Sequence, residues 1–129
     1  MAIRIVRLGE KRAKGEGLRL GTVRHLPRGV PKSEYARRDL FDLWLPELAP
    51  SAELVRTIHG AADFEAAWPR FVRRFRSEMK QPAAARLLDL LAALSHQTAF
   101  AVGCYCEEAS RCHRSVLAEL LAERGAEIV

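Results

Sequence analysis

Apolar and basic residues alternate in a short segment near the N-terminus, residues 3–8. This two-residue period is typical of a strand. A loop rich in glycine and lysine, residues 9–17, separates it from a second strand-like segment, residues 18–25. Pro27 and Pro31 each remove a backbone donor and should end regular structure there. The N-terminal region therefore predicts two strands.

The next segment, residues 32–50, fits no single element. It contains aromatic and aliphatic side chains that favour burial, but Pro46 and Pro50 limit any helix in it to a short one. Trp44 and Tyr35 are better explained as core residues than as the walls of a pocket. We therefore predict no long helix or strand here.

Three helices are expected in the middle of the chain. Ser51 is a good N-cap and Gly60 a good stop for the first, Pro69 suits the first turn of the second, and Pro82 opens the third. The second helix carries one apolar stripe at helical spacing. The members of that stripe are Trp68, Phe71, Val72, Phe75 and Met79.

The C-terminal third gives the clearest pattern. Residues 98–104 form a continuous apolar run, typical of a buried parallel strand. A polar loop, residues 107–111, leads to a helical stripe over residues 114–124, and residues 126–129 resemble a short strand. A strand, a helix and a strand of these lengths form a right-handed crossover. The fold class expected is α/β: a small Rossmann-like three-layer domain with a mainly parallel sheet and helices on both faces.

Length and composition restrict the class of protein further. A chain of 129 residues fits one domain, residues 1–129, and 49% hydrophobic residues is an ordinary globular composition. No apolar run reaches the roughly 20 residues of a membrane helix, so we expect no membrane partner. Three clustered cysteines, an odd number, do not make a disulfide framework, so reduced thiols in the cytoplasm are the simpler expectation.

The chain is basic, with 21 Lys and Arg against 16 Asp and Glu and a net charge of +5. Nucleic acid or a modest anionic ligand, such as a nucleotide, fits this balance equally well. However, most of the cations are arginines that alternate with acids along amphipathic helices, which is typical of a solvated face. Charge leaves the partner and the oligomeric state open.

Groups suited to chemistry follow two of the predicted strands. Arg24 and Arg28 follow the second strand, and Cys106, Glu107 and a Cys-His-Arg turn (residues 112–114) follow the apolar one. Ligands of parallel sheets bind beyond the carboxyl ends of the strands. Because a helix start favours anions, we expect an open, electropositive hollow there and a lowered pKa for the cysteine of the turn.

Metal binding is a weaker interpretation of the same residues. Cys104, Cys106, Cys112 and His113 could supply four zinc ligands, but they lack the usual Cys-x2-Cys spacing. Adjacent ligands at 112 and 113 also make a tetrahedron difficult. We therefore expect no metal and no cofactor, and we expect Cys104 to be a core residue.

These residues resemble a known family. The Cys-His-Arg turn after an apolar strand and an acidic loop is similar to the C-terminal signature of the domain of unknown function 488 family. The exit from Arg24 to Gly29 and the segment 44–51 resemble the YeaO-like branch of that family. The resemblance covers nearly the whole chain and implies a Rossmann-like fold with both strand exits facing one pocket. It implies no reaction.

The leading hypothesis is a small enzyme-like domain that binds an anionic or phosphate-bearing ligand. Arg24, Arg28 and Arg114 would hold the anion, with Cys106 beside them. Cys112 would be the reactive thiol, with His113 or Glu107 as its proton partner.

Two alternatives remain open. One is a non-catalytic module for nucleotides or nucleic acid, with the arginines of residues 70–76 as an electrostatic footprint. The other is a thiol redox sensor in which Cys106 pairs with Cys112. An exposed Cys112 beside an anion would favour a catalytic pocket, and a buried Cys112 beneath a basic surface would favour the module.

Overall fold

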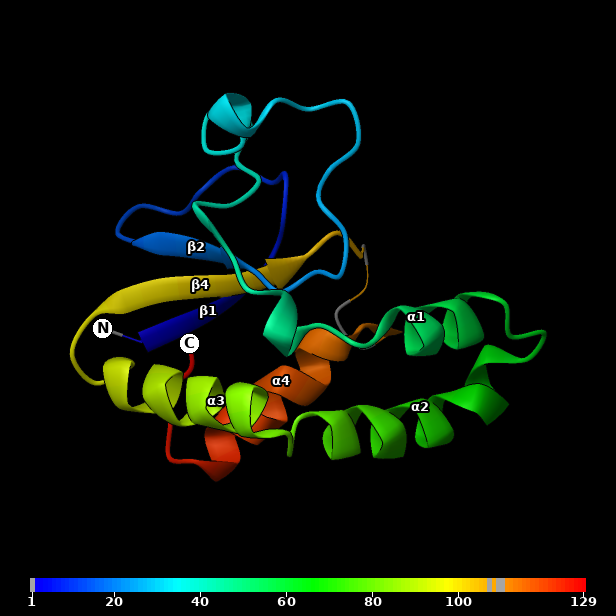
Figure 1. Ribbon diagram of the computed structural model, residues 1–129. Helices are drawn as coiled ribbons and strands as arrows, with labels where there is room; N and C mark the ends of the chain where they lie inside the picture. The colour runs from blue at the N-terminus through cyan, green and yellow to red at the C-terminus, as the bar shows by residue number, and fades with distance from the viewer. Residues whose placement is uncertain (1, 107, 109–110) are drawn as a thin grey trace.

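The computed structural model describes residues 2–106, 108 and 111–129, and it combines one sheet with helices (Figure 1). The strands are β1 (Ala2–Arg7), β2 (Leu18–Gly21), β3 (Leu43–Trp44) and β4 (Ala99–Cys104). The α-helices are α1 (Ala52–His59), α2 (Phe64–Glu78), α3 (Pro82–Leu94) and α4 (His113–Glu123). The short 3-10 helices are η1 (Lys32–Glu34) and η2 (Pro46–Leu48).

Within the described residues, the sheet has the order β1-β4-β2-β3, and every pairing in it is parallel. β4 lies between β1 and β2, which explains its continuous apolar sequence, because a central parallel strand is covered on both faces. Gly103 pairs with Val6 on one side and Gly21 on the other. A Cβ on Gly103 would lie 2.6 Å from the Val6 carbonyl oxygen, so this close approach requires glycine.

The α/β fold and the parallel sheet expected from the sequence are confirmed. α3 and α4 lie under one face of the sheet, and α1 and α2 extend this layer past the carboxyl ends of the strands (Figure 1). Apolar side chains of the sheet and all four helices form one core. The third layer, on the opposite face, consists of loops and η1.

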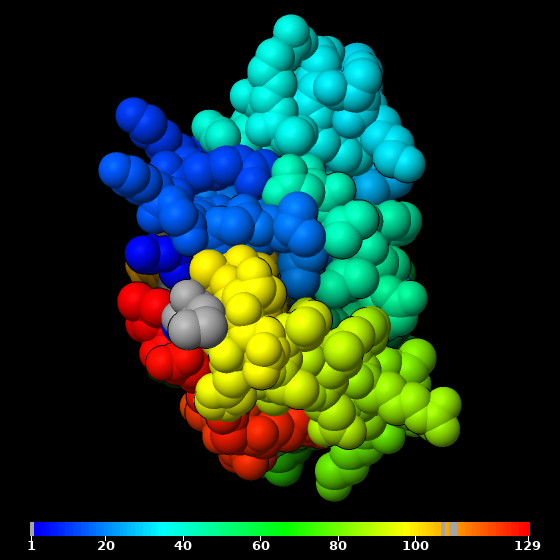
Figure 2. All heavy atoms as spheres, turned by 90° about the vertical axis from the view of Figure 1, so that its left-hand side faces the viewer, coloured from blue at the N-terminus to red at the C-terminus, as the bar shows by residue number. Residues whose placement is uncertain are grey.

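That loop layer is closed by a buried ion pair. Arg19 of β2, 1% exposed, donates from Nε and Nη2 to the two carboxylate oxygens of Glu16, at 2.9 and 3.0 Å. Its Nη1 donates to the carbonyls of Glu10 and Asp39. Seen from the amino ends of the strands, the blue N-terminal loop packs between the cyan segment above and the yellow start of β4 below (Figure 2).

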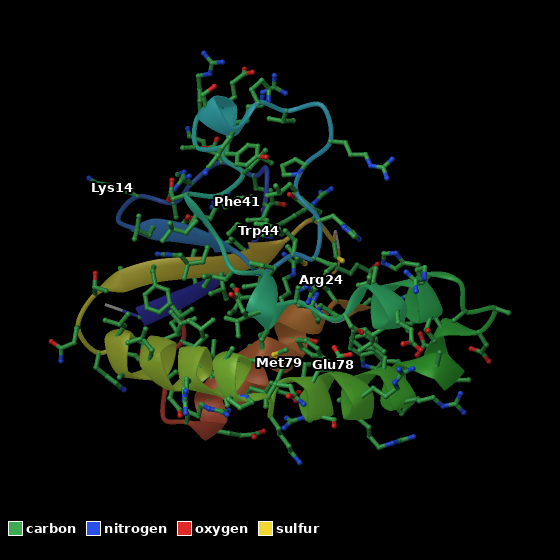
Figure 3. All side chains as sticks on the ribbon, in the orientation of Figure 1. Lys14, Arg24, Phe41, Trp44, Glu78 and Met79 are labelled. Carbon is green, nitrogen blue, oxygen red and sulfur yellow. The ribbon has the colours of Figure 1, made fainter. Side chains whose placement is uncertain are left out.

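Several sequence-based boundaries are confirmed. Ser51 caps α1, with its Oγ accepting from the Leu54 N–H at 3.2 Å, and Gly60 ends that helix. The Ser51 N–H donates to Glu78 Oε1, and this links α1 to the end of α2 (Figure 3). Pro82 opens α3, as predicted. The stripe on α2 also faces the core.

Other boundaries are wrong. Pro69 lies inside α2, not in its first turn, because Asp63 caps the helix by accepting from the Ala66 N–H at 3.2 Å. β2 ends at Gly21 instead of continuing to residue 25. The C-terminal segment makes only an isolated bridge between Ile128 and Ile3, not a strand.

Membrane crossing can be assessed from the helices. None of those in the described segments is both long and apolar enough to span a bilayer.

Candidate functional site

The two strand exits meet at one edge of the sheet, as the sequence predicted. The Thr22 hydroxyl and N–H, just after β2, both donate to the Gly103 carbonyl near the end of β4, each at 3.0 Å. The Thr22 carbonyl accepts from Nε2 of His113, at the start of α4, at 2.6 Å. Thr22 therefore ties β2, β4 and α4 together, a role that its sequence position did not reveal.

This bond fixes the protonation of His113. A carbonyl oxygen can only accept, so Nε2 carries the proton and Nδ1 has a lone pair when the ring is neutral. Burial lowers the pKa of His113 to about 4, and the ring is neutral near pH 7. Nδ1 lies 3.6 Å from the Cys112 sulfur. The edge of the ring also packs against Phe75 of α2, with ring centroids 5.5 Å apart.

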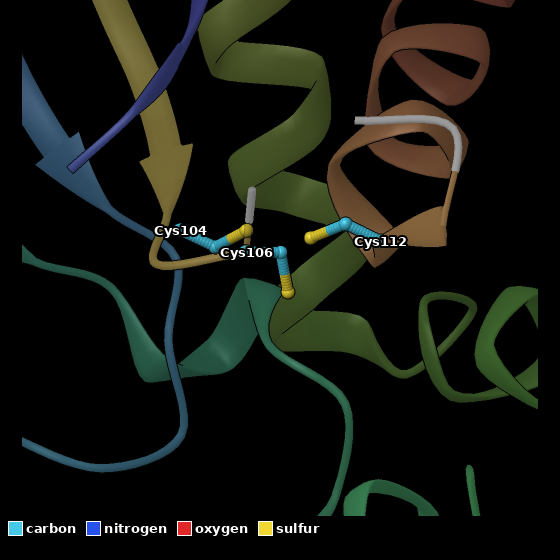
Figure 4. Close-up of side chains that lie close together, drawn as sticks. All are labelled: Cys104, Cys106 and Cys112. Carbon is cyan, nitrogen blue, oxygen red and sulfur yellow. The ribbon is translucent and has the colours of Figure 1, made fainter. Parts of the chain in front are cut away.

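Three cysteine sulfurs converge beside this histidine. Cys104 ends β4, Cys106 lies two residues beyond it, and Cys112 immediately precedes α4 (Figure 4). Their Sγ atoms all lie within 4.8 Å of one another, and all three are free thiols. The cysteine cluster, as we call Cys104, Cys106 and Cys112, is also a potential ligand set for a soft metal ion.

The members of the cysteine cluster have different electrostatics. Hydrogen bonds from the thiols of Cys104 and Cys112 lower the pKa of Cys106, and the charge of Arg114 acts in the same direction. The same network raises the pKa of Cys104 to about 11, and with burial it raises the pKa of Cys112 strongly. One negative charge is therefore favoured on Cys106, the least buried of the three sulfurs.

The lowered pKa expected for Cys112 at the helix start is therefore wrong. Cys112 is only 2% exposed, and its side chain makes no capping hydrogen bond to α4. His113 and Arg114 are buried as well, so the first turn of α4 is enclosed. The hollow that reaches this helix start is lined by His113 but not by Cys112, which borders only a smaller cavity of about 50 Å³. The hydrogen bonds with Cys104 and Cys106, together with burial, raise the pKa of Cys112 despite its place at the helix start.

A cavity of about 200 Å³ opens beside the cysteine cluster. Both strand exits and α1 line it, in agreement with the shared pocket that was expected. Its lining residues are Val23, Arg24, His25, Pro50, Val55, His59, Cys104, Tyr105, Cys106 and His113. A smaller cavity of about 50 Å³ adjoins it on the α2 side.

The predicted arginines behave differently from one another. Arg24 lines the cavity, but its Nε donates to the Pro50 carbonyl at 2.9 Å and its Nη2 to the carbonyls of Pro46 and Ala49 (Figure 3). Arg28 is exposed and is not among the described residues that line the cavity.

The structure gives different positions to the remaining predicted site residues, Arg114 and Glu107. Arg114 is buried and donates from Nη2 to the Cys106 carbonyl at 2.7 Å, so it positions the cysteine loop. Glu107 lies outside the described residues. His59, the last residue of α1, was not among the predicted site residues, yet it lines both cavities.

The comparisons with known proteins agree with this architecture. The family model DUF488-N3a, described as the active DUF488-N3 subclade, matches residues 3–125. No match was found among curated proteins or among solved structures. Because the family model covers nearly the whole chain, including both strand exits and the Cys-His-Arg turn, this protein belongs to the DUF488 family.

Proposed function

We propose that this domain is a small thiol-dependent enzyme for a small anionic substrate, with Cys106 as its nucleophile. The observation that carries the proposal is geometric. Cys106 is the one half-buried member of the cysteine cluster, and it lines a cavity that is also lined by Arg24 and three histidines. The description of the matched subclade as active supports a catalytic interpretation.

Cys106 has the surroundings that a thiolate nucleophile needs. Two neighbouring thiols and the Arg114 guanidinium stabilise negative charge on its sulfur. Thiolates of lowered pKa that remain accessible are the reactive ones, whereas buried cysteines are inert. The nucleophile is therefore assigned to Cys106 rather than to Cys112, and Cys112 acts as a hydrogen-bond donor to it.

The cavity restricts the substrate to a small anion. Its volume of about 200 Å³ is below the 300–1,000 Å³ usual for drug-sized ligands. Arg24, His25 and His59 bring positive or protonatable groups to its wall. A compact phosphate ester or carboxylate fits this combination of size and charge.

The acid–base roles fall to the exposed histidines. The thiolate of Cys106 would form a bond to the electrophilic centre, and the leaving group would depart with its electron pair and take a proton from His25 or His59. His113 is unsuited to that role, because its Nε2 proton is held by the Thr22 carbonyl. The Nδ1 atom of His113 lies 3.6 Å from the Cys112 sulfur.

A ligand screen tests the proposal. In a thermal-shift assay with a panel of small phosphate esters and carboxylates, compounds that bind the site should raise the Tm of the protein. A ligand that binds only the folded state stabilises that state. We expect Arg24→Gln to lose that shift, measured against its own ligand-free Tm, while the matched control Arg28→Gln retains it.

The covalent step has a separate readout. An intact-mass adduct with an active compound should form in the wild type and disappear in Cys106→Ser. An adduct that persists in Cys106→Ser, or an equal loss of the thermal shift in both arginine variants, would contradict the proposal.

A nucleic-acid module receives less support from the surface of α2. Arg74 lies 3.7 Å from Glu53, and Arg76 bonds both Glu119 and Glu123 of α4. These pairs reduce the electrostatic footprint available to a phosphate backbone. Cys112 is buried, the result expected of a module, but Cys106, which lines the cavity, is only half-buried. Binding to DNA that weakens steeply with salt would revive this alternative.

A thiol redox sensor is favoured by one observation, the proximity of the Cys106 and Cys112 sulfurs. A disulfide would require these atoms to approach to about 2.05 Å. After mild peroxide treatment, a loss of two mass units that is absent in both Cys106→Ser and Cys112→Ser but retained in Cys104→Ser would identify that bond.

A further inference from the structure

We propose that the cysteine cluster, together with His113, forms a binding site for a Zn²⁺ ion. The site would use the sulfurs of Cys104, Cys106 and Cys112 and the Nδ1 atom of His113. Its three cysteines come from the end of β4, the segment just after it, and the position immediately before α4 (Figure 4), and His113 is the first residue of that helix. The spacing of these residues along the chain had argued against such a site, and their arrangement in the fold supports it.

The sulfur positions are close to those of a zinc site. Zn–S bonds of about 2.3 Å in a tetrahedron place two sulfurs about 3.8 Å apart. The three Sγ atoms already lie within 4.8 Å of one another. The most distant pair would have to approach by at most about 1 Å. Cys106 follows the end of β4 and is only half-buried, so its side chain can make that movement.

His113 can supply the fourth ligand after a movement toward the cluster, because its Nδ1 atom lies near the Cys112 sulfur but its ring nitrogens are not within 4.8 Å of all three sulfurs. With Zn–N near 2.05 Å, a nitrogen and a sulfur on one tetrahedral zinc ion are separated by about 3.6 Å. His113 Nδ1 and the Cys112 sulfur are 3.6 Å apart. The other ring nitrogen donates to the Thr22 carbonyl at 2.6 Å. A backbone carbonyl on the second nitrogen is the usual outer partner of a metal-bound histidine, because it fixes the tautomer and the orientation of the ring.

Charge and donor chemistry favour this ion. Thiolate sulfur selects soft or borderline cations such as Zn²⁺ over Mg²⁺ or Ca²⁺. Three thiolates, one neutral imidazole and one Zn²⁺ carry a net charge of −1, and the guanidinium of Arg114 lies close enough to act on Cys106. Each thiol proton leaves for solvent as its Zn–S bond forms, and no atom changes its oxidation state.

Zinc would compete with the proposed reaction, since both need Cys106. The inference rests on the same cysteine cluster as the proposed function, but it does not depend on any reaction. The metal-loaded form would hold the nucleophile in a closed four-ligand site, and the metal-free form would expose it to the cavity.

Cobalt substitution tests the site in the full, reduced chain. Titration of the metal-free protein with Co²⁺ should give sulfur-to-cobalt charge-transfer bands and the strong visible bands of tetrahedral cobalt, and Zn²⁺ should abolish both. Cys104→Ser and Cys112→Ser should weaken Zn²⁺ binding more than about 100-fold, since even outer partners of a metal contribute about 10–100-fold. The control His96→Gln, at an exposed histidine, should bind like the wild type. Octahedral cobalt spectra without sulfur bands, or equal zinc affinity in the cysteine variants, would overturn the proposal.

A second measurement needs no variant and is independent of folding defects. Intact-mass analysis after alkylation should show fewer modified cysteines with one equivalent of Zn²⁺ than without it, and a chelator should restore the modification. Unchanged alkylation with zinc would reject the metal site and leave Cys106 reactivity intact. Protection by zinc, combined with slow alkylation of the metal-free Cys106, would support the metal site and reject the nucleophile.

Discussion

Two clusters of ionisable side chains are buried in this small domain, and they are built in opposite ways. On the loop-covered face, Arg19 gives four hydrogen bonds: two to the Glu16 carboxylate and one to each of two backbone carbonyls. Burial alone would raise the pKa of Glu16, but the bonds from Arg19 and the Ala13 N–H lower it below its ordinary value. Every partner in this cluster is fixed by the fold.

At the carboxyl edge of the sheet, the three sulfurs of the cysteine cluster have few protons with which to hydrogen-bond one another. Thiols are weak donors and weak acceptors, so their mutual bonds hold them less firmly than the arginine fork holds its carboxylate. Cys104 and Cys106 also line a cavity, and Cys106 is the more exposed of the two. The buried ionisable groups of the first cluster therefore have a structural role, and those of the second are the candidates for a chemical role. What distinguishes them is whether the fold already supplies strong partners for every polar atom.

The largest expected effect tests the closed cluster. Arg19→Met leaves Glu16 buried without its partner, and breaking a buried pair in this way costs about 3–5 kcal/mol. Denaturant unfolding should show this loss in the free energy of unfolding. The double variant with Glu16→Leu should recover much of it, and Arg37→Ala, in an exposed pair with Glu34, should change stability by less than about 0.5 kcal/mol. If the single and double variants were equally unstable, packing rather than charge would account for the loss.

The next effect concerns pH and His113. Its pKa in the folded protein is about 4, below the ordinary value of 6.5, so between these values only the unfolded chain takes up the proton. Stability should therefore fall as pH decreases from 6.5 to 4, by about 3 kcal/mol from this group. The difference between wild type and His113→Gln in urea unfolding at each pH isolates this contribution. Parallel pH profiles would show that His113 is not buried in its neutral form.

The two arginines after β2 give a smaller contrast. Arg24 serves three carbonyls in the segment from η2 to α1, whereas Arg28 is exposed. Because hydrogen bonds to charged groups contribute about 1.5–3 kcal/mol, Arg24→Met should lower the free energy of unfolding by about 2 kcal/mol. Arg28→Met should leave it within about 0.5 kcal/mol. Equal effects would mean that the arginine at 24 does not hold this segment in solution.

Local signals in the sequence predicted much of the framework. The apolar run of β4, the Ser51 cap and Pro82 each act within a few residues, so each is visible without the tertiary structure. Asp63 was an equally local signal, but Pro69 was given more weight, and the start of α2 was placed too late. β3 has only two residues and was not foreseen, since its pairing with β2 depends on the whole loop between them.

Only part of the site could be predicted from the sequence, because some of its contacts depend on the tertiary structure. That the two strand exits meet follows from the parallel sheet. The position of Cys104 within reach of Cys112 depends on the path of the chain between β4 and α4, which spacing does not determine. The sequence does not indicate that Cys112 is enclosed and Cys106 accessible, because the burial of each cysteine depends on how the segments around it pack in the fold.

The central claim is that Cys106 is the accessible thiolate of the cysteine cluster, and site-resolved alkylation tests it most directly. The metal-free protein would be treated with iodoacetamide between pH 6 and 8, and the modification of each cysteine followed by peptide mass spectrometry. Cys106 should react first. Its rate should change less than about 3-fold between pH 6 and 8, because the lowered pKa of Cys106 keeps its sulfur ionised throughout this range. An ordinary thiol of pKa 8.5 would slow by about 80-fold from pH 8 to pH 6. A Cys106 rate that falls in that ordinary way, or a Cys112 that reacts first, would contradict the account.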